Sequence, residues 1–211
     1  MADEKQAQKQ KGPQTAESSA VQKQKAAAKA TWKGKEWYEL VAPKLFGERV
    51  IAETPASDIE QLKGRTVTVN ASVLTGNPSK YYFKIFFRIA DVSGRKAACE
   101  YIGHECSRDF ISRMVRRRSK RIDTRDVVTL KDGKRVVVKV IATTIRPTKT
   151  SIVSEVAKRI SASVAKTVST METDDLIKEM LAGSLQKSVR TEVSKVYPLR
   201  ELEINKTEMV A

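Results

Sequence analysis

The chain has 211 residues, enough for one sizeable core or two small ones, and carries 40 Lys and Arg against 25 Asp and Glu. A formal charge of +15 attracts polyanions, so nucleic acid is the expected partner, ahead of a membrane surface. Two cysteines that fit no disulfide framework, no apolar run of spanning length and no apolar signal core argue against export or membrane insertion and predict a cytoplasmic protein.

The expected organisation is a basic tail over 1–31, one domain over 32–200 and a C-terminal tail over 201–211. The first segment is rich in Gln, Lys, Ala and Ser, so it is expected to be disordered on its own. Its Lys-Ala part either becomes helical on RNA or stays solvated. Within the domain, residues 48–146 are expected to be β-rich and residues 150–197 helical.

Alternating apolar and polar residues predict strands in the first half of the domain. Val67, Val69, Ala71 and Val73 alternate with polar residues, as a half-buried strand requires. Trp37 is expected in the core, beside Tyr38 and Leu40. The elements expected in this half are strands over 49–53, 65–73, 81–89 and 96–102, and a short helix over 57–64 that carries Ile59 and Leu62 inward.

A basic helix is expected to begin after Ser107. Phe110, Ile111 and Met114 recur at helical spacing and form an apolar stripe. Basic residues are expected on the opposite side: Arg113, Arg116, Arg117 and Lys120. Arg118 points toward the stripe, so either the helix ends near it or its side chain extends out to solvent.

A hairpin and several helices are expected to follow. The Asp132-Gly133 pair between the runs 126–130 and 135–145 is a strong hairpin signal. The second run is apolar at both alternations, which predicts a central strand covered on both faces. A period of 3.6 then predicts a long helix through Ile152, Val153, Val156, Ile160, Val164 and Val168. Helices from Thr173 and Ser184 come next, and residues 199–204 alternate too irregularly for more than a weak strand. The expected fold class is α+β, with a mostly antiparallel β core and the basic and C-terminal helices packed on it.

A series of short motifs, specific in its order, covers roughly residues 32–200. It consists of Trp37-Tyr38, Ala42-Pro43, Phe46, Leu62-Lys63-Gly64-Arg65, Asp91-Val92, Gly94, Arg108-Asp109, Met114-Val115 and Tyr197-Pro198-Leu199. In these motifs the chain resembles the archaeal and eukaryotic small-subunit ribosomal proteins called eS-one, formerly S-three-a. The chain departs from the sequences typical of this family at Lys44-Leu45 and at Gly47. The N-terminus differs from the eukaryotic one, and the chain ends without a long extension, as in an archaeal member.

The resemblance implies a sheet-based, partly barrel-like core with C-terminal helices. It also implies a structural role in the small ribosomal subunit, on the platform near the messenger exit. The implied partners are small-subunit rRNA, neighbouring small-subunit proteins and messenger RNA near the exit, with no membrane, no homo-oligomer and no cofactor.

The best RNA-binding candidates lie between residues 113 and 125. Seven cations stand there against Asp123 alone, and such crowding is tolerable when phosphates neutralise it. They are Arg113, Arg116, Arg117, Arg118, Lys120, Arg121 and Arg125. Weaker candidates at turns and element ends are Lys33, Lys35, Lys63, Arg65, Lys80, Arg146 and Lys149. Two roles remain for Trp32: a position in the core, or stacking on unpaired bases.

The single histidine, His104, lies near Cys99 and Cys106 and invites a metal-site or nucleophile interpretation. The spacing fits neither a structural zinc site nor an assembled nucleophile, so a plain loop histidine is expected. No catalytic or metal-binding residue is therefore assigned, and the chain is expected not to be an enzyme. Two alternatives remain: a free-standing RNA-binding or RNA-chaperone protein, and an RNA-processing enzyme that uses His104 or Glu105.

Overall fold

The structure, a computed structural model, describes residues 34–210. Its strands are β1 (Glu36–Val41), β2 (Val50–Ala56), β3 (Thr66–Asn70), β4 (Phe83–Ser93), β5 (Lys96–Cys106), β6 (Arg121–Thr129), β7 (Arg135–Thr144) and β8 (Leu199–Val210). Its α-helices are α2 (Ala71–Thr75), α3 (Arg108–Met114), α4 (Thr150–Val168), α5 (Thr173–Ala182) and α6 (Ser184–Val193). Three single 3-10 turns are η1 (Lys44–Phe46), η2 (Ile59–Gln61) and η3 (Pro78–Lys80).

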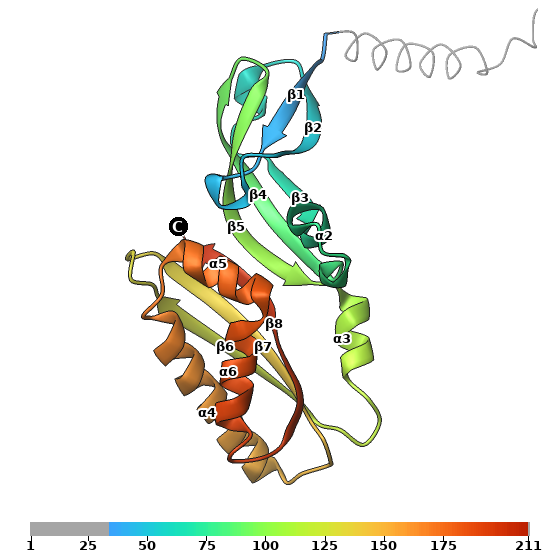
Figure 1. The fold of residues 1–211 in the computed structure, drawn as a ribbon, viewed down its shortest axis with the longest axis vertical. Helices are drawn as coiled ribbons and strands as arrows, with labels where there is room; N and C mark the ends of the chain where they lie inside the picture. The colour runs from blue at the N-terminus through green and yellow to red at the C-terminus, as the bar shows by residue number, and fades with distance from the viewer. Residues whose placement is uncertain (1–33, 211) are drawn as a thin grey trace, which may run out of the picture.

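The described chain forms two lobes on one continuous sheet (Figure 1). The strand order is β2-β1-β5-β8-β7-β6, and β4 and β3 branch from β5 on the first lobe. Each lobe has its own apolar core. The long strand β5 belongs to the first lobe and reaches β8 of the second, so the two lobes share backbone hydrogen bonds.

The first lobe is an incomplete barrel. Strands β3, β4, β5, β1 and β2 follow one another, with β1 parallel to β5 and the other pairs antiparallel. The two edge strands do not pair; instead Arg65, just before β3, donates from Nη1 to Thr54 Oγ1 at 2.7 Å and to the Pro55 carbonyl at 3.2 Å on β2. The expected α+β class and mostly antiparallel sheet are confirmed, and the barrel is open.

Two elements of the first lobe differ from the expectation. The strand expected over 65–73 ends at Asn70, and the chain turns into α2, in which Ala71 and Leu74 are buried at helical spacing. Val73 is consequently 63% exposed. In place of the helix expected over 57–64 there is one 3-10 turn, η2, which buries none of its residues: Ile59 is exposed, and Leu62, which is buried, comes directly after the turn.

Trp37 is exposed, which corrects its expected place in the core. Residues alternate across a strand, and in β1 the inward positions are held by Tyr38 and Leu40. Trp37 therefore faces outward and is 55% exposed.

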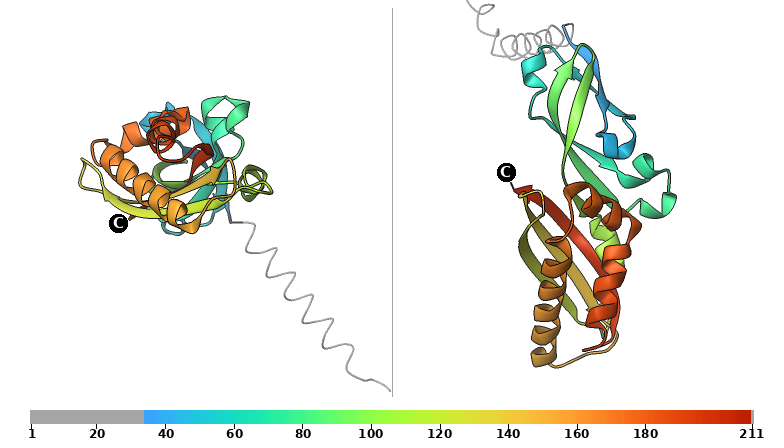
Figure 2. Two further views of the ribbon diagram at one scale, coloured as in Figure 1. Left: turned by 90° about the horizontal axis from the view of Figure 1, so that it is seen from below. Right: turned by 60° about the vertical axis from the view of Figure 1, so that its left-hand side comes forward.

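The second lobe confirms the predicted hairpin and long helix. Strands β6 and β7 pair around the Asp132-Gly133 turn, and β7 is buried along nearly its whole length. Val156, Ile160 and Val164 of α4 pack with the strand residues in one core. Figure 2 shows α4 and α6 side by side over one face of these strands.

The last strand corrects the expected C-terminal tail over 201–211. β8 lies between β5 and β7, in the middle of the sheet. Its pairing with β7 shifts register near Arg200 and again near Asn205, so the buried positions pass from Leu199 to Leu202 and Ile204, and then to Thr207. These two irregularities break the two-residue alternation, so the strand signal in the sequence is weak.

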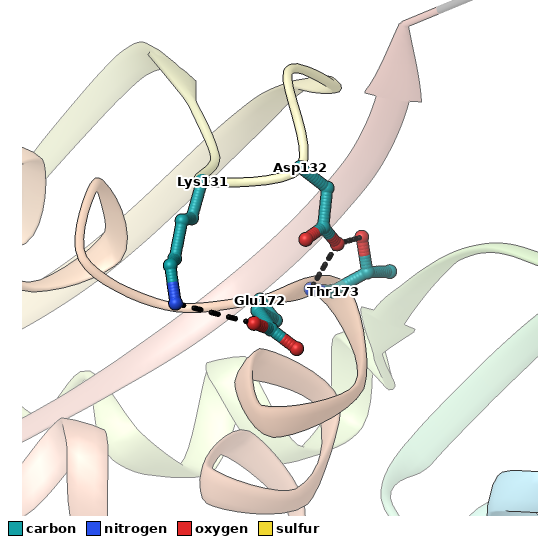
Figure 3. A network of polar contacts seen from close by, with 4 residues as sticks. All are labelled: Lys131, Asp132, Glu172 and Thr173. Atoms are coloured by element: carbon teal, nitrogen blue, oxygen red, sulfur yellow. Dashed lines mark hydrogen bonds and ion pairs between the residues drawn. The ribbon is translucent and has the colours of Figure 1, made fainter.

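The hairpin turn also holds the start of α5 (Figure 3). Asp132 Oδ2 accepts hydrogen bonds from the backbone N–H and the hydroxyl of Thr173, both at 2.9 Å, and Lys131 lies 3.3 Å from Glu172. The hydrogen bonds from Thr173 lower the pKa of Asp132. The cap of this helix thus comes from a residue 41 positions earlier in the chain.

His104 lies in β5 at the junction of the lobes and is buried, which corrects the expected loop position. Its Nε2 faces the Ile204 carbonyl at 3.1 Å, and a carbonyl only accepts, so Nε2 carries the proton. Nδ1 then accepts from the Thr207 hydroxyl at 2.7 Å, and Tyr101 donates to that hydroxyl at 3.0 Å. Burial lowers the pKa of His104 to about 4. The histidine is a neutral core residue that links β5 to β8.

Candidate nucleic-acid interface

The predicted basic run between residues 113 and 125 spans three elements instead of one helix. α3 ends at Met114, a loop covers residues 115–120, and β6 begins at Arg121. Arg118 has a φ of 64° in that loop, a left-handed conformation that no helix contains. Of the two alternatives for Arg118, the structure shows the one in which the helix ends before it.

The expected placement of four basic residues on one helix face is therefore wrong. Arg113 alone of these four lies on α3, while Arg116, Arg117 and Lys120 lie in the loop. The cause is the hydrogen bonding of Lys120 with Thr144 of β7, because it places the start of β6 directly after Lys120 and leaves no room for another helical turn.

Residues 115–120 are anchored against the second lobe by Thr144 at the end of β7. The Lys120 N–H donates to Thr144 Oγ1 at 2.9 Å, and the Thr144 N–H donates to the Lys120 carbonyl at 3.0 Å. Within the loop, the Ser119 hydroxyl donates to the Arg116 carbonyl at 2.6 Å. These bonds bring the loop beside the segment 145–149, which joins β7 to α4.

Both segments carry basic residues, and with the start of β6 they lie at the end of the second lobe drawn at the bottom of Figure 1. We call them the basic end: Arg116, Arg117, Arg118, Lys120, Arg121, Arg146 and Lys149. All seven are exposed. Among the described residues, Asp123 alone forms an ion pair with the basic end, at 2.9 Å from Arg121. The basic end is a concentrated positive surface on a rigid sheet.

Two further predicted residues flank the basic end. Arg113 donates from Nη1 to the Tyr81 hydroxyl at 3.1 Å. Arg125 is exposed on β6 directly opposite Lys139 of β7, which in turn lies opposite Lys206 of β8. Sequence reasoning missed Lys139, although a lysine inside an otherwise apolar strand was a visible signal. Lys139 and Lys206 both lie near Glu208, at 3.9 Å and 2.5 Å, so Arg125 is the least neutralised of the three.

The other predicted residues lie in the first lobe and are not brought to the basic end. Lys63 forms an exposed ion pair with Asp91 at 3.5 Å. Arg65 is half-buried between the edge strands, and Lys80 lies over the rings of Tyr82 and Phe83, 6.0 and 5.4 Å from their centres. Lys35 is exposed on the first lobe. Lys33 and Trp32, and the tail expected over 1–31, lie outside the described residues.

The residues considered for catalysis or metal binding are not arranged for either. Cys99 and Cys106 are buried, and burial raises the pKa of both thiols. Between Gly34 and Val210 no three His, Cys, Asp or Glu side chains are close enough together to hold a metal ion. No described helix is long and apolar enough to cross a membrane.

Comparison with known proteins gives the family. A model of the Ribosomal S3Ae family matches residues 23–211. The chain belongs to this family. Among its relatives, the small ribosomal subunit protein eS1 of Sulfurisphaera tokodaii is 37% identical over 186 residues, which are 88% of this chain and 96% of that protein. The eS1 protein of Saccharolobus solfataricus is 37% identical over 184 residues, 87% of this chain and 88% of the relative.

Membership confirms the resemblance and its archaeal type, since these relatives are archaeal. The family is one of ribosomal structural proteins, so the family and not the absence of a site argues against enzymatic activity. The eS1 proteins are components of the small ribosomal subunit by name.

Proposed function

We propose that this chain is a structural component of the small ribosomal subunit in the cytoplasm, and that its basic end binds rRNA. The observation that carries the RNA contact is the meeting of residues 115–120 with residues 145–149. These two loops contribute six exposed cations and the first residue of β6 contributes Arg121, so seven exposed cations lie at one end of the molecule. A merely soluble basic protein has no need to gather them there.

The chemistry of the basic end suits a phosphate backbone. Arg offers a planar fork of donors that matches two phosphate oxygens, and Lys adds a mobile point charge. Close cations repel one another in water, and phosphates relieve this repulsion while their own counterions are released. Such contacts position RNA without reading its sequence.

The finer location is also part of the proposal. The family resemblance implies the platform of the small subunit near the messenger exit, with neighbouring small-subunit proteins and messenger RNA within reach. The protein acts there as a single copy that fills space between RNA and its neighbours.

A tethered cleavage reagent tests the RNA contact and the location together. Cys99 and Cys106 are buried, so an Arg117→Cys variant presents one reactive thiol to an iron chelate that generates hydroxyl radicals. In reconstituted small subunits we expect rRNA cleavage confined to the platform near the messenger exit. Cleavage elsewhere would reject the location, and intact rRNA would reject the RNA contact.

A further inference from the structure

The outer face of the β1–β2 hairpin carries an exposed aromatic side chain. Trp37 is 55% exposed, while its strand neighbours Tyr38 and Leu40 are buried in the first lobe. Pro55 of β2 lies directly opposite Trp37 across the strand pair. Exposed tryptophan is uncommon on a free surface and is enriched where proteins bind one another.

Two carboxylates adjoin this apolar pair. Glu39 lies directly opposite Glu53, one outward position along from the pair formed by Trp37 and Pro55. Like charges directly opposite in a sheet destabilise the strand pair. Lys96 of β5 flanks Glu39 on its other side, while β2 is the edge strand and Glu53 is exposed. A cation from another molecule placed between the two glutamates would stabilise them.

This acidity is local. Residues 34–64 contain four Lys and Arg against six Asp and Glu, within a chain whose formal charge is +15. In Figure 1 the β1–β2 hairpin lies at the end of the molecule opposite the basic end. Arg95 and Lys96 of the β4–β5 hairpin lie beside Glu39 and offset this acidity, so this end lacks the one-sided positive charge of the basic end and suits a different partner.

We propose that Trp37, Glu39, Glu53 and Pro55 form a docking surface for an arginine-bearing segment of a neighbouring protein. The guanidinium lies over the indole of Trp37, and its N–H groups donate to the two carboxylates. An aromatic face attracts a cation, and a carboxylate accepts the paired donors of Arg. RNA is disfavoured because both glutamates repel phosphates. The docking surface adds a protein partner to the proposed ribosomal role and is independent of RNA binding at the basic end.

Photo-cross-linking in assembled small subunits tests the docking surface. Benzoylphenylalanine at position 37 retains an aromatic face and reacts with whatever lies against it. After irradiation and nuclease digestion, we expect an adduct with one ribosomal protein, attached within a peptide that contains Arg. Attachment to rRNA, attachment to a peptide without Arg or Lys, or no adduct would overturn the proposal.

A charge reversal supplies the second measurement. In the same cross-linking chain, Glu39→Lys with Glu53→Lys should reduce the protein adduct at least tenfold, because two cations now repel the arginine. An unchanged adduct would overturn the proposal. Benzoylphenylalanine at position 117, in otherwise unaltered chains, should instead give rRNA adducts, so failure of RNA binding at the basic end is scored separately from failure of the docking surface.

Discussion

Arg118 is exposed and charged, and its backbone has a conformation that is unfavourable for residues other than glycine. Its φ of 64° lies in the left-handed region, where glycine is at ease and other residues are strained by about 1 kcal/mol. The residue therefore suggests that the charge matters more at this point than local stability, as strained residues at functional sites often do.

Two substitutions separate the strain from the charge. Arg118→Gly and Arg118→Ala both remove the cation, but only glycine relieves the backbone strain. We expect the glycine variant to be the more stable of the two by about 1 kcal/mol in urea denaturation, with equal losses of RNA affinity. Unequal affinities or equal stabilities would contradict this account.

His104 should make stability depend on pH. Its pKa is lowered from 6.5 to about 4 in the folded protein. Above pH 6.5 the residue is neutral in both states; below it the unfolded chain binds a proton that the folded protein refuses. The free energy of unfolding should therefore fall from pH 6.5 toward pH 4, by up to roughly 3 kcal/mol.

Urea denaturation at several pH values measures this dependence. His104→Gln removes the titrating group, so its stability should change less between pH 6.5 and 4 than that of the unaltered protein. An equally steep decline in both proteins would assign the effect to carboxylates instead.

Gly103 lies where the backbone of β5 passes very near the backbone of β8. A Cβ built on this residue would overlap the Thr207 carbonyl oxygen, which belongs to the backbone of β8 and can move away only if the strand itself shifts. The pairing of the two strands covers three residue pairs between Gly103 and Glu105 on β5, so this contact carries much of the connection between the lobes.

Gly103→Ala should consequently destabilise the protein by about 3 kcal/mol, as overpacking does. Gly133→Ala is the control, because nothing lies within 4 Å of its added Cβ and its only cost is the left-handed φ of 77°, a strain that Gly103 does not share. That variant should lose about 1 kcal/mol. Comparable losses measured by urea denaturation would show that the β5–β8 approach is not what requires glycine at position 103.

Elements with a local signature were predictable from the sequence. The Asp132-Gly133 hairpin and the apolar stripe of α4 depend on neighbours in sequence, and both are confirmed. β8 was not, because its register shifts near Arg200 and Asn205 disrupt the alternation and its partners lie far away in the chain. The early end of α3 at Met114 likewise depends on the distant pairing of Lys120 with Thr144.

The basic end was likewise predictable in part: its residues were identified from the sequence, but their arrangement was not. Sequence reasoning identified its residues because charge is visible in composition, yet it assigned several of them to one helix face. Their true arrangement needs the two loops to meet, which is a property of the tertiary fold. Trp37 was misplaced because its neighbours suggested a core, whereas strand alternation turns it outward.

RNA affinity should depend on where the positive charges lie in the molecule and not only on the net charge. Arg116→Gln, Arg117→Gln and Arg146→Gln together remove three cations from both loops. We expect weaker RNA binding and a slope of log affinity against log salt that is shallower by about 3. Filter binding at several salt concentrations measures the slope, and sedimentation with small subunits should fall in parallel.

The matched control removes the same charge elsewhere. Lys44, Lys84 and Lys158 are exposed and lie outside the basic end, so their replacement by Gln should leave the slope nearly unchanged. If both triple variants lose the same slope, the net charge governs binding and the basic end has no special part in it.

The central position of β8 has a consequence for synthesis. A chain leaves the ribosome from its N-terminus, so the strand that completes the middle of the sheet emerges after the other seven described strands. The strands of the first lobe are synthesised early in translation. β5 and β7, in contrast, are connected in the sheet only after β8, Leu199–Val210, has been synthesised. The sheet is therefore incomplete until residues 199–210 have been synthesised, and nascent chains that stop short of residue 199 should be recognised as unfinished by proteases.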